Sequence, residues 1–320
     1  MKVALLFLLI SITAQSQVLG CTDSISKNFD SKAIINDGSC FYENVKLKPE
    51  YSFRLSDSLK ETSGLISFEN LLWTHNDDHD TTIYGLDSLG KIKKKIVLPE
   101  VINHDWEEIA QDNTHIYIGD FGNNYSGNRT DLKILKIEKK SFLHENPKIE
   151  TISFSYSDQT DFSPSKPNKT NFDCEAFIVS KDSIYLFTKQ WKSSKTSIYS
   201  LPNQSGMQIA KLNATLDSKG LVTSATYLKE KKLIALCGYT KAGKPFLYLL
   251  YDFKNPDFLS GNKRRIDLKL PFHQVEGIAT KDGLHYFITN ESLVRKPILN
   301  NPQQIHYLDL SSLLGLYLHK

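Results

Sequence analysis

The stretch HDWEEIA (residues 104–110) places two glutamates at the start of an apolar run. Glutamate is a poor strand former and is seldom buried without a partner, so its position here needs a reason. The same shape, an acid followed by one small or polar residue and an apolar run, recurs in NFDCEAFIV (171–179) and HQVEGIATK (273–281). KETSGLIS (60–67) and LVTSATYL (221–228) repeat it with serine in place of the acid. The chain therefore contains a five-fold internal repeat.

The repeat predicts the fold. Between the repeated stretches the chain alternates apolar and polar residues with period two, and the turns are rich in Asn, Asp, Gly and Ser. Repeats of about 50 residues built from such strands are typical of a β-propeller with four-stranded blades. We predict an all-β, five-bladed β-propeller. A six-bladed propeller is the alternative, and it would need a further repeat that the chain lacks.

The last repeat contains only three strand segments. The segment YSFRLSD (51–57), which precedes the first repeat, can supply the fourth by pairing with residues 304–310. A ring closed in this way by both termini leaves no open sheet edge.

Three regions are expected along the chain. Residues 1–17 have one early lysine and a short apolar core, as in a secretory signal peptide, and are too short to span a membrane. A short module with a linker follows at 18–47, and the propeller occupies 48–320. No other stretch is long and apolar enough for a transmembrane segment. Cys174 and Cys237 lie in strand-like apolar contexts, and we expect buried free thiols.

The 39 basic and 36 acidic residues leave a net charge of only +3 and are spread along the chain. This balance gives no footprint for nucleic acid, which usually needs a strongly basic face. We expect no nucleic-acid partner and a monomeric protein.

The aligned repeats place one column of residues at the start of each innermost strand. Because these strands line the channel and begin at the same face, the column residues should converge at one channel end. Oxygen ligands from Glu and Ser suit a hard cation such as calcium, which would relieve the repulsion among the carboxylates. The alternative is that the glutamates line a watery channel or pair with lysines. The column consists of Ser63, Glu107, Glu175, Ser224 and Glu276.

Further polar residues should surround the same channel end. Asp105 and Asp173 lie two residues before a column glutamate and therefore share its side of the pleat, whereas Glu108 should point the other way. Turns between the second and third strands open on this face and provide the candidate binding rim and further catalytic candidates. The rim candidates are Asn76, Asp77, Asn123 and Trp191, and the catalytic candidates are Asp105, Asp120, Asp173 and Lys189.

The order Ser, Glu, Glu, Ser, Glu of the column is similar to that of the calcium-activated apyrases. The resemblance implies a five-bladed propeller whose channel calcium is held by the five column residues. The wider pattern also resembles a group of uncharacterised secreted bacterial propellers. That pattern consists of LLWTHNDD, HDWEEIA, IYIGDFGNN, FDCEAF and LFTK.

The segment before the propeller resembles the short GCTD…DGSC module of secreted proteins from Gram-negative bacteria. This resemblance implies a disulfide between Cys21 and Cys40, which export makes chemically reasonable. The competing interpretation reads Val18-Leu19-Gly20-Cys21 as a lipobox, which would make Cys21 a lipid anchor. The protein is therefore expected to be secreted, extracellular or periplasmic, or else a lipoprotein.

Three classes of function remain open. The first is a non-catalytic propeller whose calcium site helps to recognise an extracellular glycan, peptide or other small molecule. The second is a calcium-dependent phosphoester or phosphoanhydride hydrolase of apyrase or phytase type, in which the cation polarises phosphate oxygens and water. Lyase or lactonase chemistry, known from other metal propellers, is a third possibility. Fold alone does not decide among them.

Overall fold

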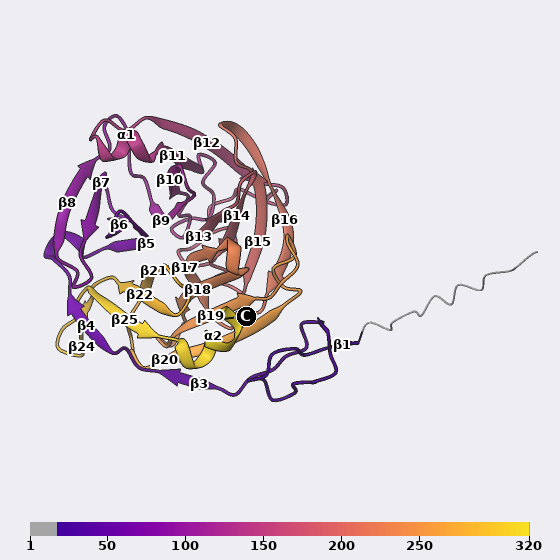
Figure 1. Cartoon of the computed structure of the whole chain (residues 1–320). Coiled ribbons are helices and arrows are strands. Elements are labelled where there is room, and N and C mark those ends of the chain that lie inside the picture. Colours follow the sequence, from indigo (N-terminus) through magenta and orange to yellow (C-terminus); the bar gives the residue numbers. More distant parts are fainter. Residues whose placement is uncertain (1–17, 320) are drawn as a thin grey trace, which may run out of the picture.

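A computed structural model describes residues 18–319 of the chain, so the predicted signal peptide (1–17) lies outside the described residues. The chain is nearly all β, and Figure 1 shows its sheets arranged around a central axis. The fold is of the β-propeller type, as the repeats predict. Within residues 18–319 no helix is both long and apolar enough to cross a membrane.

Twenty strands build the propeller and fall into four positions from the axis outward (Figure 1). The innermost strands are β5 (Thr62–Phe68), β9 (Trp106–Gln111), β13 (Cys174–Val179), β17 (Leu221–Leu228) and β21 (Val275–Thr280). The second strands are β6 (Leu71–Asn76), β10 (His115–Asp120), β14 (Ser183–Thr188), β18 (Leu233–Tyr239) and β22 (His285–Asn290). The third strands are β7 (Thr82–Leu86), β11 (Lys133–Glu138), β15 (Thr196–Pro202), β19 (Pro245–Tyr251) and β25 (Gln304–Asp309). The outer strands are β8 (Ile92–Val97), β12 (Ile149–Tyr156), β16 (Gly206–Leu216), β20 (Asn262–Leu268) and β4 (Tyr51–Arg54).

Each innermost strand pairs antiparallel with its second strand, and the meander continues outward. In the sheet β21-β22-β25-β4, strand β4 pairs antiparallel with β25 in the register Tyr51↔Tyr307 to Arg54↔Gln304. The innermost strands contact one another in the cyclic order β5, β9, β13, β17, β21 and back to β5. These contacts surround the central channel.

Outer strands also pair between neighbouring sheets. Strand β12 runs parallel to β16, and β3 (Val45–Leu47) runs parallel to β20. The remaining elements are short. They are β1 (Leu19–Gly20), β2 (Ile35–Asn36), β23 (Leu293–Arg295), β24 (Leu299–Asn301), α1 (Lys139–Leu143), α2 (Ser311–Leu318) and two 3₁₀ turns at Asp57–Leu59 and Lys229–Lys231.

The hydrophobic core lies between neighbouring sheets. The cluster between the first two sheets, for example, contains Trp73 of β6, Ile109 of β9 and Ile118 of β10, all fully buried. Phe142 of α1 closes this cluster from outside, with its ring centroid 5.0 Å from that of Trp73. Burying such a side chain stabilises the fold by roughly 1.5–3 kcal/mol. The apolar side chains thus pack between neighbouring sheets, whereas polar side chains at the start of the innermost strands face the channel.

The segment before the propeller is held by a disulfide between Cys21 and Cys40, as the resemblance predicted. In this disulfide the sulfur of Cys21 is not available for the lipid anchor of the competing interpretation. The module packs against the propeller, since Tyr251 donates a hydrogen bond of 2.7 Å to Asp23 and Asn36 donates one of 2.8 Å to Asp252. The other two cysteines of the chain are buried free thiols, as predicted.

Candidate metal and ligand site

A β-bulge lies near the start of every innermost strand. In β9, β13, β17 and β21 one residue is left without a partner on the second strand, and in β5 the residues Gly64 and Leu65 share one. A bulge re-aims side chains and raises the local twist. Since the five bulges lie at one end of the channel, they determine which side chains enter it. The unpaired residues are Glu107, Glu175, Thr223 and Glu276.

A cavity of about 210 Å³ lies at this channel end and collects most of the predicted column. Ser63, Glu107, Glu175 and Glu276 all line it, whereas Ser224 does not. The aligned position in β17 is Thr223, because the bulge shifts the register of this strand by one residue. Ser224 instead accepts a hydrogen bond of 3.2 Å from the backbone N–H of Ile278.

Glu108 also points into the channel, contrary to the prediction that it would face away. Its carboxylate accepts hydrogen bonds from the backbone N–H of Ala225 (2.7 Å) on β17 and from that of Ile109 (3.0 Å). Strict alternation fails here because the bulge at Glu107 places two consecutive side chains on the channel side. Glu108 is completely buried, and burial holds the pKa of this carboxyl well above its usual range. It links two non-adjacent innermost strands.

Three carboxylates meet closely at the cavity. Glu107, Asp173 and Glu175 each offer an oxygen such that all three oxygens lie within 4.8 Å of one another. Two oxygens bound to one calcium ion at about 2.4 Å each are at most about 4.8 Å apart, so this spacing fits a shared ion. All three residues are buried. Asp173 is held in place by the backbone N–H of Asn123 (2.7 Å) and the indole N–H of Trp191 (2.6 Å).

Lys189 is the one cation among the residues that line the cavity. Its Nζ lies 2.9 Å from Glu175 Oε1 and over the rings of Trp191 and Tyr239, at 4.9 and 5.3 Å from their centroids. Burial alone would lower the pKa of Lys189, but the negative charge around it, that of Glu175 foremost, raises the pKa well above its usual value. The lysine is therefore a fixed positive charge inside an acidic cavity.

The carboxyl groups outnumber this charge. Five of them line the cavity: Asp77, Glu107, Glu175, Glu276 and Glu291. Burial and mutual repulsion raise their pKa values. The pKa is about 7 for Asp77, Glu175 and Glu276, and Glu107 and Glu291 are raised well above the usual range. Within residues 18–319, Glu276 Oε2 is buried and has no hydrogen-bond partner. The cavity thus has a deficit of positive charge and an unused ligand atom.

Asp105 adjoins these groups, and burial with the neighbouring Asp173 charge raises its pKa to about 6. Gly122 makes room for it. A Cβ at this position would lie 2.2 Å from Glu107 Oε1 and 2.3 Å from Asp105 Oδ2. Only glycine allows the backbone to approach both carboxylates so closely.

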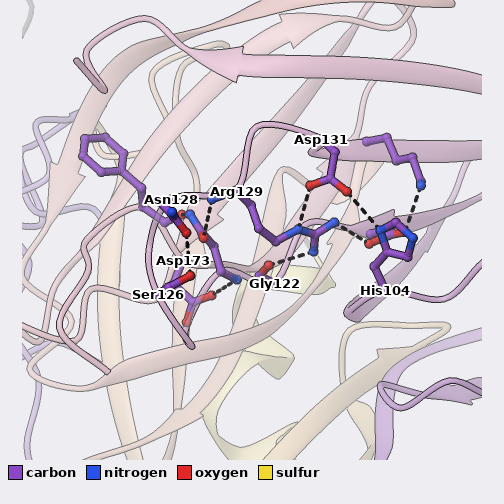
Figure 2. Close-up of polar contacts among 11 residues, drawn as sticks. His104, Gly122, Ser126, Asn128, Arg129, Asp131 and Asp173 are labelled. Atoms are coloured by element: carbon purple, nitrogen blue, oxygen red, sulfur yellow. Dashed lines mark hydrogen bonds and ion pairs between the residues drawn. The ribbon is translucent and has the colours of Figure 1, made fainter. Parts of the chain in front are cut away.

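Asp120, a catalytic candidate, has a different role. Its carboxylate pairs with Arg129 (2.9 Å) and Lys133 (3.3 Å) and does not line the cavity. Figure 2 shows Arg129 at the centre of this network, where it also donates to the Gly122 carbonyl (2.8 Å) and to Asp131 (3.0 Å). The network anchors the loop that carries Gly122. Asp120 therefore helps to position the loop beside the site, and its ion pairs with Arg129 and Lys133 stabilise its charged form.

Two of the four predicted rim residues line the cavity and two do not. Asp77 and Trp191 line the cavity. Asn76 is buried and donates to the Ser58 carbonyl (2.9 Å), and Asn123 accepts from the Arg129 backbone N–H (3.0 Å), so both serve their own loops. The amides that do line the cavity are Asn124, Asn168 and Gln274.

Glu291, Tyr239 and Gln274 are site residues that the sequence reasoning missed. A signal existed for Glu291, because Asp77, Lys189 and Glu291 each directly follow the end of a second strand. These three residues form a second column, and all three line the cavity. Glu291 also accepts a hydrogen bond from the side-chain amide of Gln274. Together with Glu61, the residues Asp77 and Glu291 form a further carboxylate group whose oxygens lie within 4.8 Å.

A larger cavity of about 630 Å³ adjoins the first and shares Trp191, Tyr239, Asn168 and Gln274 with it. Its own lining combines the aromatic ring of Phe272 with positive charges. The cations are Lys169, Lys241 and Arg295. A ligand could place one polar group at the acidic cavity and lay its remainder over these residues.

No family model matches the chain, and no curated protein matches it in sequence. Among solved structures, the PQQ-bound form of aldose sugar dehydrogenase from Streptomyces coelicolor is similar over 82% of this chain and 98% of that chain, at 10% identity and a TM-score of 0.46. A streptogramin B lyase is similar over 81% and 86%, at 14% identity and a TM-score of 0.39. A chain of the mitotic checkpoint complex gives 95% and 99% coverage at 8% identity and a TM-score of 0.40. At such values the likeness does not extend to activity or ligands.

Proposed function

We propose that this protein is a secreted, five-bladed β-propeller that binds calcium at the acidic end of its channel and recognises an extracellular glycan or peptide there without catalysis. The cyclic contacts of the five innermost strands support the blade count, and the pairing of β4 with β25 supports closure by the N-terminal strand. The Cys21–Cys40 disulfide supports export to an oxidising compartment.

The observation that carries the cation proposal is the uncompensated negative charge. Five carboxyl groups and one ammonium group line the cavity, Asp105 and Asp173 adjoin it, and Glu276 Oε2 lacks a partner within residues 18–319. Converging buried carboxylates are costly unless they are protonated or neutralised. Oxygen-only donors from carboxylates and amides match calcium, which takes six to eight such ligands. Magnesium demands a tighter octahedral shell and fits less well.

Recognition of a glycan or peptide fits the adjoining cavity. Trp191, Tyr239 and Phe272 offer aromatic surface, and Asn168 and Gln274 offer amides. The side chains that line the two cavities within residues 18–319 include no histidine and no cysteine. The one serine, Ser63, donates a hydrogen bond of 2.6 Å to the Glu107 carbonyl. This lining provides contacts for binding but no serine–histidine or cysteine–histidine pair.

A second candidate is the calcium-dependent phosphoester or phosphoanhydride hydrolase. Lys169, Lys241 and Arg295 beside the proposed calcium favour it, because they could hold phosphate oxygens. Asp105, whose pKa of about 6 lies near neutrality, is the candidate base in this case.

Metal analysis tests the proposal. We expect mass spectrometry of protein purified without chelator to find calcium, and calorimetry of chelator-treated protein to show one calcium bound per chain. Glu276→Gln should weaken binding about tenfold, since one charged ligand is lost. The matched control is Glu230→Gln, which removes an exposed glutamate far from the cavity.

Absence of both bound metal and binding heat would contradict the calcium site. A glycan array and a panel of phosphate esters and nucleotides, each with calcium and with chelator, separate the two functions. Calcium-dependent turnover of any phosphate substrate, lost in Asp105→Asn, would favour the hydrolase over recognition.

A further inference from the structure

The opposite end of the channel opens into a wide hollow of about 1140 Å³. Its walls come from the turns that follow the innermost strands, so it lies about four residues, or roughly 13 Å, along those strands from the acidic cavity. No part of it overlaps the proposed calcium site. Six lysines line the hollow: Lys136, Lys139, Lys181, Lys229, Lys231 and Lys281.

Two of the lysines are hydrogen-bonded within the protein, since Lys139 donates to the Gln111 side chain (2.8 Å) and the Asp112 carbonyl (2.6 Å), and Lys231 donates to the Leu318 carbonyl (3.2 Å). None of the six forms an ion pair within residues 18–319. Three acids line the same hollow, and two of them are occupied. Asp112 accepts from the backbone N–H of His115 (2.7 Å) and the hydroxyl of Tyr117 (2.7 Å), and Asp282 accepts from both the backbone N–H (2.8 Å) and the ring (2.6 Å) of His285. The three carboxylates keep their negative charge, but the six lysines outnumber them, so among residues 18–319 the lining of the hollow carries an excess of positive charge.

Converging ammonium groups repel one another, so the hollow favours an anionic ligand. Its width favours an extended ligand with charges along its length. The lysines come from four separate segments around the channel, on β11 with α1 and in the turns at 180–181, 229–231 and 281–282. An ion of the size of phosphate could touch only a few of them.

The side chains between the lysines indicate the class of polyanion. The exposed Asn113 offers an amide to sugar hydroxyls, whereas the amides of Gln111 and Asn203 already donate to the Ser67 carbonyl (3.0 Å) and to the Tyr117 hydroxyl (3.0 Å). Among residues 18–319 no arginine lines the hollow, although arginine is the preferred residue for bidentate phosphate contacts. Two rings that could stack on a base line the hollow, and both pack within the protein. Phe68 is covered by Lys139 at 4.9 Å from its centroid and stacks on Trp73, and Tyr227 packs edge-on against Phe258 at 6.2 Å. Single-stranded nucleic acid usually needs open aromatic platforms.

We propose that this basic hollow binds an acidic polysaccharide, whose carboxylate or sulfate groups pair with its lysines, chiefly Lys136, Lys181, Lys229 and Lys281. The site is independent of calcium and of the proposed function at the other end. The Cys21–Cys40 disulfide favours an oxidising, extracellular compartment, where the protein would meet such polysaccharides.

Binding of dextran sulfate and of polygalacturonate, measured by interferometry in EDTA at 50 mM salt, tests this proposal. The charge-reversal pair Lys181→Glu with Lys281→Glu should weaken both about tenfold, because two favourable contacts become repulsive. The control pair Lys94→Glu with Lys211→Glu makes the same change in net charge on exposed outer strands and should change binding less than about twofold. Unchanged melting temperatures establish that both pairs fold.

Higher salt should weaken binding of the wild type, and uncharged dextran should not bind. Equal losses in the two pairs, or no binding of either polysaccharide at 50 mM salt, would overturn the proposal. Lysine-dependent binding of a single-stranded oligonucleotide or of phosphatidylserine vesicles, with neither polysaccharide bound, would also overturn it. Failure here leaves the calcium proposal untouched, since every arm contains EDTA.

Discussion

The two ends of the channel are built from the same five strands and carry opposite charge. At the start of the strands, bulges direct the buried side chains of Glu107, Glu175 and Glu276 into a small cavity. At their far end, lysines on turns surround a wide hollow. The net charge of +3 conceals this separation. Charge placement along a strand, rather than composition, therefore determines what each face can bind.

The difference between the ends is also one of burial. Lys189 is buried and paired with Glu175, whereas Lys181 at the other end is exposed and unpaired within residues 18–319. Losing one partner of a buried pair costs far more than losing a solvated charge. Comparable substitutions at the two ends should thus have unequal effects.

The largest effect is expected for Lys189→Met. At pH 8 without calcium it leaves Glu175 buried and unpaired, and the free energy of unfolding should fall by about 3–5 kcal/mol. Lys181→Met should change it by less than about 0.5 kcal/mol. Urea denaturation measures both. Calcium should restore much of the loss in Lys189→Met, and equal effects of the two substitutions would contradict the contrast between the ends.

Glu108, between the two ends, should come next. Glu108→Ala leaves the backbone N–H groups of Ala225 and Ile109 buried without their acceptor, at a cost of about 2–4 kcal/mol. Glu230→Ala, at the rim of the basic hollow, is the matched control and should be nearly neutral. If both unfold at the same urea concentration, the cross-channel link contributes nothing.

Calcium should raise the free energy of unfolding by binding at the acidic end of the channel and not at the basic end. At about 100 times its dissociation constant, one bound ion raises the free energy of unfolding by roughly 2.7 kcal/mol, which amounts to several degrees in melting temperature. The shift should shrink in Glu276→Gln and persist in the Lys181→Glu, Lys281→Glu pair. A chelator scan that leaves the melting temperature of the wild type unchanged would remove the basis for the site.

The last contrast between the two ends concerns the pH dependence of stability. Burial raises the pKa values of Asp77, Glu175 and Glu276 to about 7, so between pH 4 and 7 the folded protein keeps protons that the unfolded chain has lost. Without calcium, stability should therefore fall as pH rises through this window, by about 1.4 kcal/mol per pH unit for each net proton. Glu276→Gln should flatten the slope and Glu230→Gln should not. Stability that rises over this range, with a slope that Glu276→Gln does not change, would contradict the raised pKa values of these carboxyls.

The sequence repeat was enough to predict the propeller type and the innermost strands, whereas the Cys21–Cys40 disulfide was predicted from a resemblance of the segment before the propeller. The repeat also predicted that Ser63, Glu107, Glu175 and Glu276 meet, and these four residues line one cavity. The reason is that equivalent residues of repeated units occupy equivalent positions around the channel. The repeat aligned Ser224 where the structure has Thr223, since serine matches serine by type while a one-residue bulge leaves no mark in the alignment.

The sequence by itself determined that acids stand at the start of repeated strands, because strand periodicity and repeat length are local properties of the chain. Only the tertiary structure decided that Glu108 crosses the channel to Ala225, that Arg129 holds Asp120 behind the site, and that Lys181 and Lys281 face one hollow. These contacts join residues far apart in the chain. They depend on register, bulges and loop paths that many distant packing interactions fix together, and no short stretch of sequence encodes them.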